Sequence, residues 1–322
     1  QILKKNNYTT AAIVSCIKHI QGLERGFDVF IDNGSIKADD ITQTAISWLE
    51  KKHKDRFFLW LHYYDTHSPY RPPPPYNRIF INNFNLGRRH ASIAKTYGVL
   101  GTISSFVAED NITDVDYYIS QYDGAIRFTD EQIGILLRKI KELNLDKSSI
   151  VIITADHGEL LGEHEIYFEH TNLYDATIKV PLLIKCEKII PASRIINQQV
   201  QSIDIVPTVL MLLDIPKDRH MQGESLLPLI FEDSNHHSVY AFSEEARPNN
   251  NFLRECVRAN GWKLKYKKVN THENYELYNL DKDSEESNSL INVEKEKFKF
   301  LKKELDNWRR QIPINGPKKG YP

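Results

Sequence analysis

Residues 150–164 combine an apolar segment with a cluster of ionisable side chains. The run Ile150–Thr154 is almost wholly apolar and β-branched, which is typical of a strand buried on both faces of a parallel sheet. Asp156, His157 and Gly158 follow it. Ligands of open α/β sheets bind at the carboxyl ends of the strands, and carboxylate oxygen and imidazole nitrogen are common metal ligands. The segment therefore predicts a metal site at the end of this strand.

Asp156 and His157 can reach one ion only if the chain bends there, because adjacent side chains of a straight strand face opposite ways. Gly158 makes such a bend cheap. The alternative for Asp156 is an N-cap of a helix that starts near Glu159, and for Asp156 alone the two interpretations are about equally supported. Nearby ionisable side chains favour the metal site: His157, Glu159, His164 and His170.

A second predicted strand, 57–64, also ends in a polar cluster, which contains Asp65 and His67. If both strands belong to one parallel sheet, the two clusters emerge on one rim of it. Taken alone, a histidine in a turn is more often a surface or capping residue than a catalyst, and Asp65 can cap the turn through its own backbone.

Residues 1–230 alternate strand-like and helix-like segments, which predicts an α/β fold with a mostly parallel sheet sandwiched by helices. A helix capped by Asp39 or Asp40 is expected to bury Ile41, Ala45 and Leu49. Residues 77–112 have no clear period and are expected to form a surface excursion. The other expected strands are 9–14, 150–154 and 180–185, and the other expected helices are 114–143 and 203–213. In the helix 114–143, the apolar positions at the helical period are Tyr118, Tyr122, Ile126, Ile133, Leu137 and Ile140.

The character of the sequence changes after about residue 230. Residues 262–266 and 275–280 are expected to form short antiparallel strands, and 294–310 a charged helix. We therefore predict two domains: a catalytic α/β domain over 1–230 and a small α+β subdomain over 231–322.

Net charge, apolar runs and cysteine spacing give no support to several functional classes. The formal net charge is -1, which gives no reason to expect binding to nucleic acid or to an anionic membrane surface. No apolar run is long enough to span a bilayer. The three cysteines, Cys16, Cys186 and Cys256, are far apart and form neither a disulfide framework nor a zinc-binding spacing.

Short blocks with a characteristic order run along nearly the whole chain, except for about 77–112. The most specific is Asp156–His164, which reads Asp-His-Gly-Glu-Leu-Leu-Gly-Glu-His. The others include Asn7–Ile13, Leu61–Tyr70, Tyr122–Ile126, Leu173–Asp175, Val180–Leu182 and Glu276–Tyr278. Together these blocks resemble the sulfatase family of the alkaline phosphatase superfamily, which implies an alkaline phosphatase-like fold and hydrolysis of sulfate esters on a sulfated small molecule or glycan.

The resemblance also implies roles for four residues. Asp156 and His157 would be ligands of a divalent metal, with Ca²⁺ expected first and Mn²⁺ or Mg²⁺ as alternatives. His67 would contact the sulfate and protonate the leaving alcohol. His170 stands where many family members carry a lysine, and when protonated it would bind a sulfate oxygen or assist the leaving group.

Three parts of the family pattern have no counterpart in this sequence. They are the first pair of metal-binding aspartates, the nucleophile in a C/S-x-P-x-R motif that becomes formylglycine, and a Gly-Lys-Trp-His-Leu-Gly segment, replaced here by Val14–His19. Cys16 is followed by Ile-Lys-His and is not that nucleophile. We therefore expect an N-terminally truncated chain, with formylglycine only in the missing segment. By itself, this chain would have a weak or empty metal site and negligible turnover of an aryl sulfate.

Two other functions fit the same motifs. One is a phosphodiester or phosphonate hydrolase, or a phosphoryl transferase, of the same superfamily. The other is a non-catalytic homologue that keeps the fold and binds metal or carbohydrate. The nucleophile would separate these functions, and residues 77–112 with the C-terminal subdomain would set the substrate.

Overall fold

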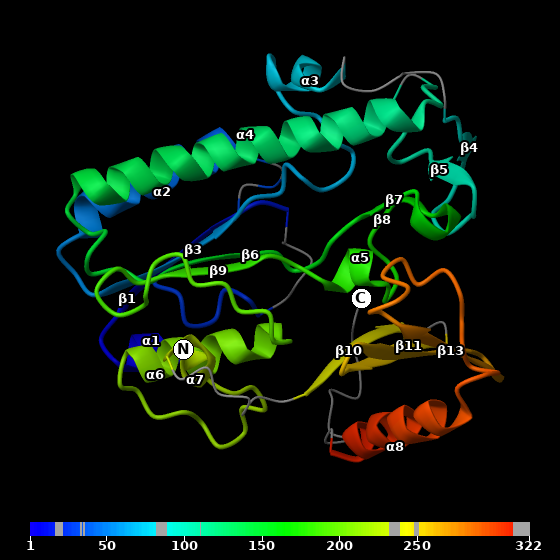
Figure 1. The fold of residues 1–322 in the computed structure, drawn as a ribbon. Coiled ribbons are helices and arrows are strands. Elements are labelled where there is room, and N and C mark those ends of the chain that lie inside the picture. The colour runs from blue at the N-terminus through cyan, green and yellow to red at the C-terminus, as the bar shows by residue number, and fades with distance from the viewer. Residues whose placement is uncertain are drawn as a thin grey trace. The chain divides into compact units, whose positions relative to one another are not determined.

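The computed structural model describes residues 1–16, 22–32, 34, 36–81, 89–109, 111–231, 239–247 and 251–311 (Figure 1). The chain divides into two compact units. Unit 1 contains Gln1–Ser149, Leu161–Glu169 and Cys186–Lys188, and unit 2 contains Ile150–Leu160, His170–Lys185 and Ile189–Pro322. The domain division at residue 230 stays a prediction, because these units follow the packing of the backbone rather than that boundary.

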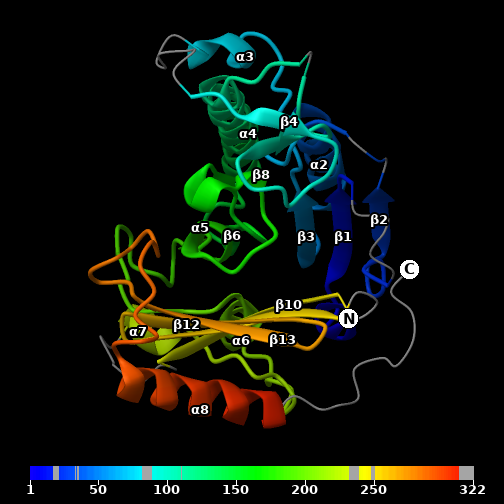
Figure 2. The same cartoon turned by 90° about the vertical axis from the view of Figure 1, so that its right-hand side faces the viewer.

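Unit 1 is built on a three-stranded parallel sheet with the order β2-β1-β3 (Figure 2). The central strand is fully buried from Ala11 to Val14, which explains its small and aliphatic side chains. In register, Ala11 lies opposite Val29 on one side and Leu59 on the other. The strands are β1 (Thr9–Val14), β2 (Val29–Asp32) and β3 (Phe57–His62), and a short helix α1 (Ile2–Lys5) precedes them.

Alternate residues of β1 pack into different clusters. Ile13 packs with Ile41 and Leu49 of α2 (Ala38–Lys52) and with Leu136 of α4 (Val115–Glu142). Ala12 and Val14 belong to a second cluster with the aromatic side chains Phe27, Phe30 and Trp60. The period-two alternation along the strand thus divides the interior of this unit between the two faces of the sheet.

Helix α2 begins at Ala38, so Asp39 and Asp40 lie inside its first turn and do not cap it. The backbone N–H of Ala38 instead donates to the carboxylate of Asp65, which follows β3. The expected cap was wrong because an acceptor far along the sequence satisfies this N–H. Both aspartates still lie at the positive end of the helix dipole, where negative charge is favourable.

Helix α4 confirms the long helix expected at 114–143, and the side chain of Asp114 accepts from the backbone N–H of Tyr117 at 3.1 Å. Two positions of the expected apolar stripe, Ile126 and Leu137, are exposed. The buried side instead contains small residues such as Gly124, because the backbone of the preceding segment packs closely there. A Cβ at Gly124 would lie 2.5 Å from the carbonyl oxygen of Tyr76.

The surface excursion contains regular structure within its described residues. Strand β5 pairs in parallel with β4 and, through Ile103 and Tyr167, with β8. Phe168 of β8 is fully buried beside Tyr70 and Tyr118. The excursion contributes α3 (Tyr76–Ile79), β4 (Ser92–Ala94) and β5 (Thr102–Ser104). The later elements beside it are β7 (Leu160–Leu161), the 3-10 turn Glu163–Glu165 and β8 (Tyr167–Glu169).

The strand that carries the predicted metal site differs from expectation. β6 (Val151–Thr154) belongs to unit 2 and pairs antiparallel with β9 (Leu182–Lys185), whereas β3 pairs in the sheet of unit 1. Its residues are only partly buried, and Thr154 is exposed. The parallel direction expected for the strands at 150–154 and 180–185 was therefore wrong, because an apolar run does not specify strand direction.

Unit 2 continues with three short helices and a C-terminal layer. The helices are α5 (Asp175–Ile178), α6 (Ile205–Leu212), preceded by the 3-10 turn Ser202–Asp204, and α7 (Leu227–Phe231). The layer is an antiparallel meander of four strands in chain order, and α8 (Lys295–Gln311) packs on it (Figure 2). Its strands are β10 (Tyr240–Arg247), β11 (Phe252–Ala259), β12 (Trp262–Val269) and β13 (His272–Asn279). The two strands and the helix expected from sequence are present, and β10 and β11 are additional.

Strand β12 is buried on both of its faces. Leu264 and Tyr266 pack with Leu301 and Leu305 of α8 in an apolar core. Lys263 and Lys265 alternate with them and therefore point to the opposite face. Buried lysines require partners, because an unpaired buried charge is costly.

Among the residues that the structure describes, no helix is both long and apolar enough to cross a bilayer.

Lys265 is expected to make stability depend on pH. Burial is the main cause that lowers its pKa to about 8, although its Nζ pairs with Glu276 Oε2 at 3.0 Å. The unfolded chain, with a lysine pKa near about 10.4, then binds more protons than the folded chain above pH 8. The free energy of unfolding should therefore rise between about pH 8 and 10, by at most about 1.4 kcal/mol per pH unit. Below pH 8 the lysine is charged in both states, so the folded chain bears the full cost of burying that charge.

Urea denaturation of Lys265→Met over this pH range should show a flatter profile than the unchanged chain. Lys267→Met, on an exposed position of the same strand, is the control. The other groups around Lys265 are Glu286, Lys263, Tyr174 and Tyr278. Burial raises the pKa of Tyr174 to about 12, so that residue changes charge above this window. Equal slopes in Lys265→Met and the unchanged chain would contradict the prediction.

Candidate functional site

The four predicted site residues belong to both units. His67 lies in unit 1, whereas Asp156, His157 and His170 lie in unit 2. Within unit 2, residues 156–159 lie close to His170, which directly follows β8. We describe the two sets separately.

The chain leaves β6 at Thr154 and reaches β7 at Leu160 without forming a helix in these described residues. Asp156 is therefore not the N-cap of a helix near Glu159, and that interpretation was wrong. Its Oδ1 accepts from the backbone N–H of His157 at 3.0 Å and lies 3.8 Å from His157 Nε2. The Asp156 side chain is 72% exposed, so its carboxylate is accessible to a ligand.

The imidazole of His157 is held by its own backbone neighbour. Nδ1 lies 2.9 Å from the carbonyl oxygen of Gly158. Because a carbonyl oxygen only accepts, Nδ1 carries the proton of this hydrogen bond, and in the neutral ring Nε2 carries the lone pair. A carbonyl partner on one ring nitrogen is the usual way to orient a metal-binding histidine.

His170 lies against His157. Their rings stack with centroids 4.1 Å apart and an interplanar angle of 18°. Nitrogen atoms of the two rings lie within 4.8 Å of each other. The buried carboxylate of Glu159 approaches the pair, with Oε1 4.0 Å from His170 Nδ1. One exposed carboxylate, one buried carboxylate and two imidazoles therefore form a single cluster in unit 2.

Gly158 is required by a close backbone contact rather than by an unusual dihedral angle. Its N–H donates to the carbonyl oxygen of Thr177 at 2.7 Å. A Cβ at this position would lie 2.0 Å from the carbonyl oxygen of Ala176. The sequence predicted a bend at this glycine. It could not predict the contact with α5, because that contact involves only backbone atoms.

In unit 1, His67 shows the same local arrangement as His157. Its Nδ1 lies 2.6 Å from the carbonyl oxygen of Ser68, and its ring stacks on Tyr64 with centroids 4.4 Å apart. Its backbone N–H donates to the carbonyl oxygen of Tyr64 at 3.0 Å, which closes the turn after β3. Burial raises the pKa of nearby Asp65, whose carboxylate accepts from Ala38.

The donor atoms in unit 2 suit a divalent cation. Carboxylate oxygen is preferred by hard cations, and imidazole nitrogen is accepted by Mn²⁺ and the later transition metals. The oriented Nε2 of His157 beside the Asp156 carboxylate fits a ligand pair.

Two family models match this chain, and together they cover residues 1–311. The family model described as "Sulfatase" matches residues 1–215, and the model described as "N-sulphoglucosamine sulphohydrolase, C-terminal" matches residues 162–311. Arylsulfatase K of Canis lupus familiaris is 27% identical over 307 residues, which cover 86% of this chain and 55% of that protein. Arylsulfatase K of Homo sapiens is 28% identical, with coverages of 86% and 55%. The chain thus spans about half the length of these curated relatives.

Solved structures share the fold. A protein solved in complex with its substrate D-glucosamine-2-N,6-O-disulfate superposes with a TM-score of 0.79 at 19% identity, over 99% of this chain and 83% of that one. The phosphonate monoester hydrolase of Agrobacterium radiobacter gives 0.74 at 17% identity, over 96% and 79%. These likenesses confirm the predicted alkaline phosphatase-like α/β fold.

Replacing Gly158 by alanine is expected to destabilise the chain by about 1–3 kcal/mol, the usual cost of overpacking, because the new Cβ collides with the Ala176 carbonyl. Gly134→Ala, inside α4, is the matched control, since its Cβ meets only the end of Arg138 at 3.6 Å. That control should be neutral or more stable by up to about 1 kcal/mol, because alanine favours helix. Chemical denaturation checks both values, and equal stabilities would disprove the close contact.

Proposed function

We propose that this chain, which belongs to the sulfatase family, supplies part of the active site of a metal-dependent hydrolase of sulfate esters. The observation that carries the proposal is the pairing of Asp156 with an oriented His157 at the end of β6, within a family match that covers residues 1–215. The exposed Asp156 carboxylate, beside an imidazole, suits binding of a cation better than a structural role. A bare helix cap would need a helix that these described residues do not form.

Sulfatases generally use a divalent metal, and the residues of this chain fit one. Asp156 Oδ1 and His157 Nε2 would hold it, since they lie 3.8 Å apart. We infer Ca²⁺ as the first candidate and Mn²⁺ or Mg²⁺ as alternatives. When bound, such an ion polarises the sulfate oxygens as a Lewis acid.

His67 and His170 would act on the substrate. His67 donates its Nδ1 proton to Ser68, which leaves Nε2 as the atom that can carry a second proton to the leaving alcohol. His170 would bind a sulfate oxygen when it is protonated. A histidine can do both near or below neutral pH, because its reference pKa is about 6.5.

The nucleophile of the proposed reaction is a formylglycine, which the family pattern places in a motif that this sequence does not contain. Cys186 and Cys256 are buried, and Cys16 lacks the proline and arginine of that motif. We therefore assign no nucleophile to these residues.

The substrate class is inferred as a sulfated glycan or sulfated small molecule. One similar structure was solved with a disulfated glucosamine and another with k-i-k-neocarrahexaose. Sulfated sugars carry anionic sulfate groups, which the proposed cation and a protonated His170 would attract.

The metal ligands can be tested directly. Asp156→Asn removes the anionic donor and should weaken binding of Ca²⁺ or Mn²⁺ by at least about tenfold, as judged by isothermal titration calorimetry. Asp218→Asn is a matched control, because Asp218 is also exposed and its Oδ1 accepts the N–H of a histidine, His220, at 2.8 Å. Unchanged affinity in Asp156→Asn would remove Asp156 from the site.

The acid role of His67 can be tested by steady-state kinetics with two sulfate esters. His67→Ala should lower kcat for an alkyl sulfate by about 10²–10⁴-fold, but much less for a nitrophenyl sulfate, whose leaving group needs no proton. Equal losses for both substrates would rule out the acid role. Turnover of a phosphonate monoester in preference to both sulfates would instead favour phosphoryl chemistry.

A further inference from the structure

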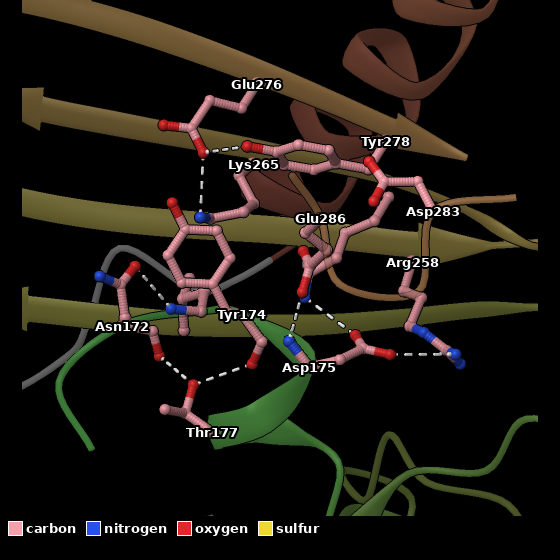
Figure 3. A network of polar contacts seen from close by, with 12 residues as sticks. Asn172, Tyr174, Asp175, Thr177, Arg258, Lys265, Glu276, Tyr278, Asp283 and Glu286 are labelled. Carbon is pink, nitrogen blue, oxygen red and sulfur yellow. Dashed lines mark hydrogen bonds and ion pairs between the residues drawn. The ribbon is translucent and has the colours of Figure 1, made fainter. Parts of the chain in front are cut away.

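A cluster of charged side chains, two of them buried and two partly buried, joins the C-terminal sheet to helix α5. We call it the Lys263 cluster, and it consists of Lys263, Asp175, Glu286 and Arg258. Figure 3 labels Asp175, Glu286 and Arg258. The Lys263 side chain is 0% exposed, and its Nζ lies 2.9 Å from Asp175 Oδ1 and 2.9 Å from Glu286 Oε1. All four residues belong to unit 2.

Asp175, the first residue of α5, is the centre of this cluster. Its backbone N–H donates to Glu286 Oε2 at 2.5 Å, and its Oδ2 lies 3.3 Å from Arg258 Nη2. Together with Oδ1, three atoms of one residue are fixed by groups from β11, β12 and the segment after β13. The start of α5 therefore has little freedom relative to the C-terminal sheet.

Helix α5 transmits this constraint to His157. Thr177 of α5 accepts the N–H of Gly158 at 2.7 Å, and the Ala176 carbonyl approaches the Gly158 α-carbon closely. Gly158 in turn accepts the Nδ1 proton of His157. The path from Asp175 to the His157 ring thus consists of one short helix and two hydrogen bonds.

The same sheet fixes the residue after His170. Arg254 of β11 donates from Nη1 to the carbonyl oxygen of Thr171 at 3.1 Å and pairs with Glu245 Oε2 at 2.7 Å. Thr177 Oγ1 also donates to the carbonyl oxygen of Asn172 at 2.6 Å. Both histidines of the stacked pair are therefore adjacent to backbone groups that the C-terminal sheet or α5 holds.

We propose that the Lys263 cluster and Arg254 are positioning groups that set the stacked arrangement of His157 and His170. This inference deepens the proposed function and rests on it. Stability alone explains the cluster poorly, since buried ion pairs are often replaced by neutral groups of similar shape without loss of stability. The polar network instead specifies one geometry, because ion pairs and hydrogen bonds are directional whereas apolar packing is permissive.

The test removes the charges and keeps the volume. The triple variant Asp175→Asn, Lys263→Met, Glu286→Gln neutralises the centre of the cluster, while Arg258 keeps its hydrogen bond to Gln199 at 2.9 Å. The matched control, Glu255→Gln with Arg309→Met, neutralises another ion pair of unit 2, which joins β11 to α8 and in which the Glu255 side chain is buried. Circular dichroism checks that each variant is folded.

Two measurements are made on the full chain. The first is the NMR contact between the rings of His157 and His170 without metal, and the second is the affinity for Mn²⁺. We expect the triple variant to lose the ring contact and about 10- to 100-fold in affinity, the usual effect of changing groups that orient metal ligands, and the control to change neither. A folded triple variant that keeps both would overturn the proposal.

Arg254→Met covers the case in which the triple variant does not fold. It should shift the ring signals of His170 more than those of His157, and equal or absent shifts would overturn the proposal. If the unchanged chain binds no Mn²⁺ or Ca²⁺, the proposed metal site fails. The ring contact still decides whether the sheet positions the two histidines.

Discussion

The contact between Gly158 and helix α5 places the end of strand β6. The Ala176 carbonyl lies where any side chain at residue 158 would be, and the Thr177 carbonyl accepts the Gly158 N–H. Both interactions use backbone atoms, so they depend on the path of the chain rather than on side-chain packing. The orientation of His157 follows from this contact because the Gly158 carbonyl holds the imidazole.

The C-terminal layer has two chemically distinct faces. On one face, Leu264 and Tyr266 of β12 build an ordinary apolar core with α8. On the other, Lys263 and Lys265 bring two buried ammonium groups to the segment 172–177. A layer needed only for stability would require the first face alone, and the second face connects this layer to residues of the candidate site in unit 2.

Much of the fold was predictable, and the failures have physical causes. The helix at 114–143 was predicted from the 3.6-residue period of its apolar positions, and the strand at 9–14 was also predicted, although two positions of the helix stripe, Ile126 and Leu137, are exposed. The direction of β9 relative to β6 was not predictable, since a short apolar run fits either orientation. The α2 cap was missed because its acceptor, Asp65, lies far along the sequence.

The candidate site was likewise predictable only in part. Asp156 and His157 were visible as a motif at a strand end. Nothing in the sequence connected them to Arg254 or Lys263, because the contacts that join these residues run through backbone carbonyls and a buried ion pair. Short motifs report the groups that do chemistry and carry little information on the scaffold that orients them.

His67 and His157 each donate Nδ1–H to the carbonyl of the very next residue. Two consecutive residues therefore determine the tautomer of each neutral ring, and no side chain from elsewhere in the chain is needed to place the proton on Nδ1. In both neutral rings the lone pair therefore lies on Nε2, whatever sheet or loop surrounds the two residues.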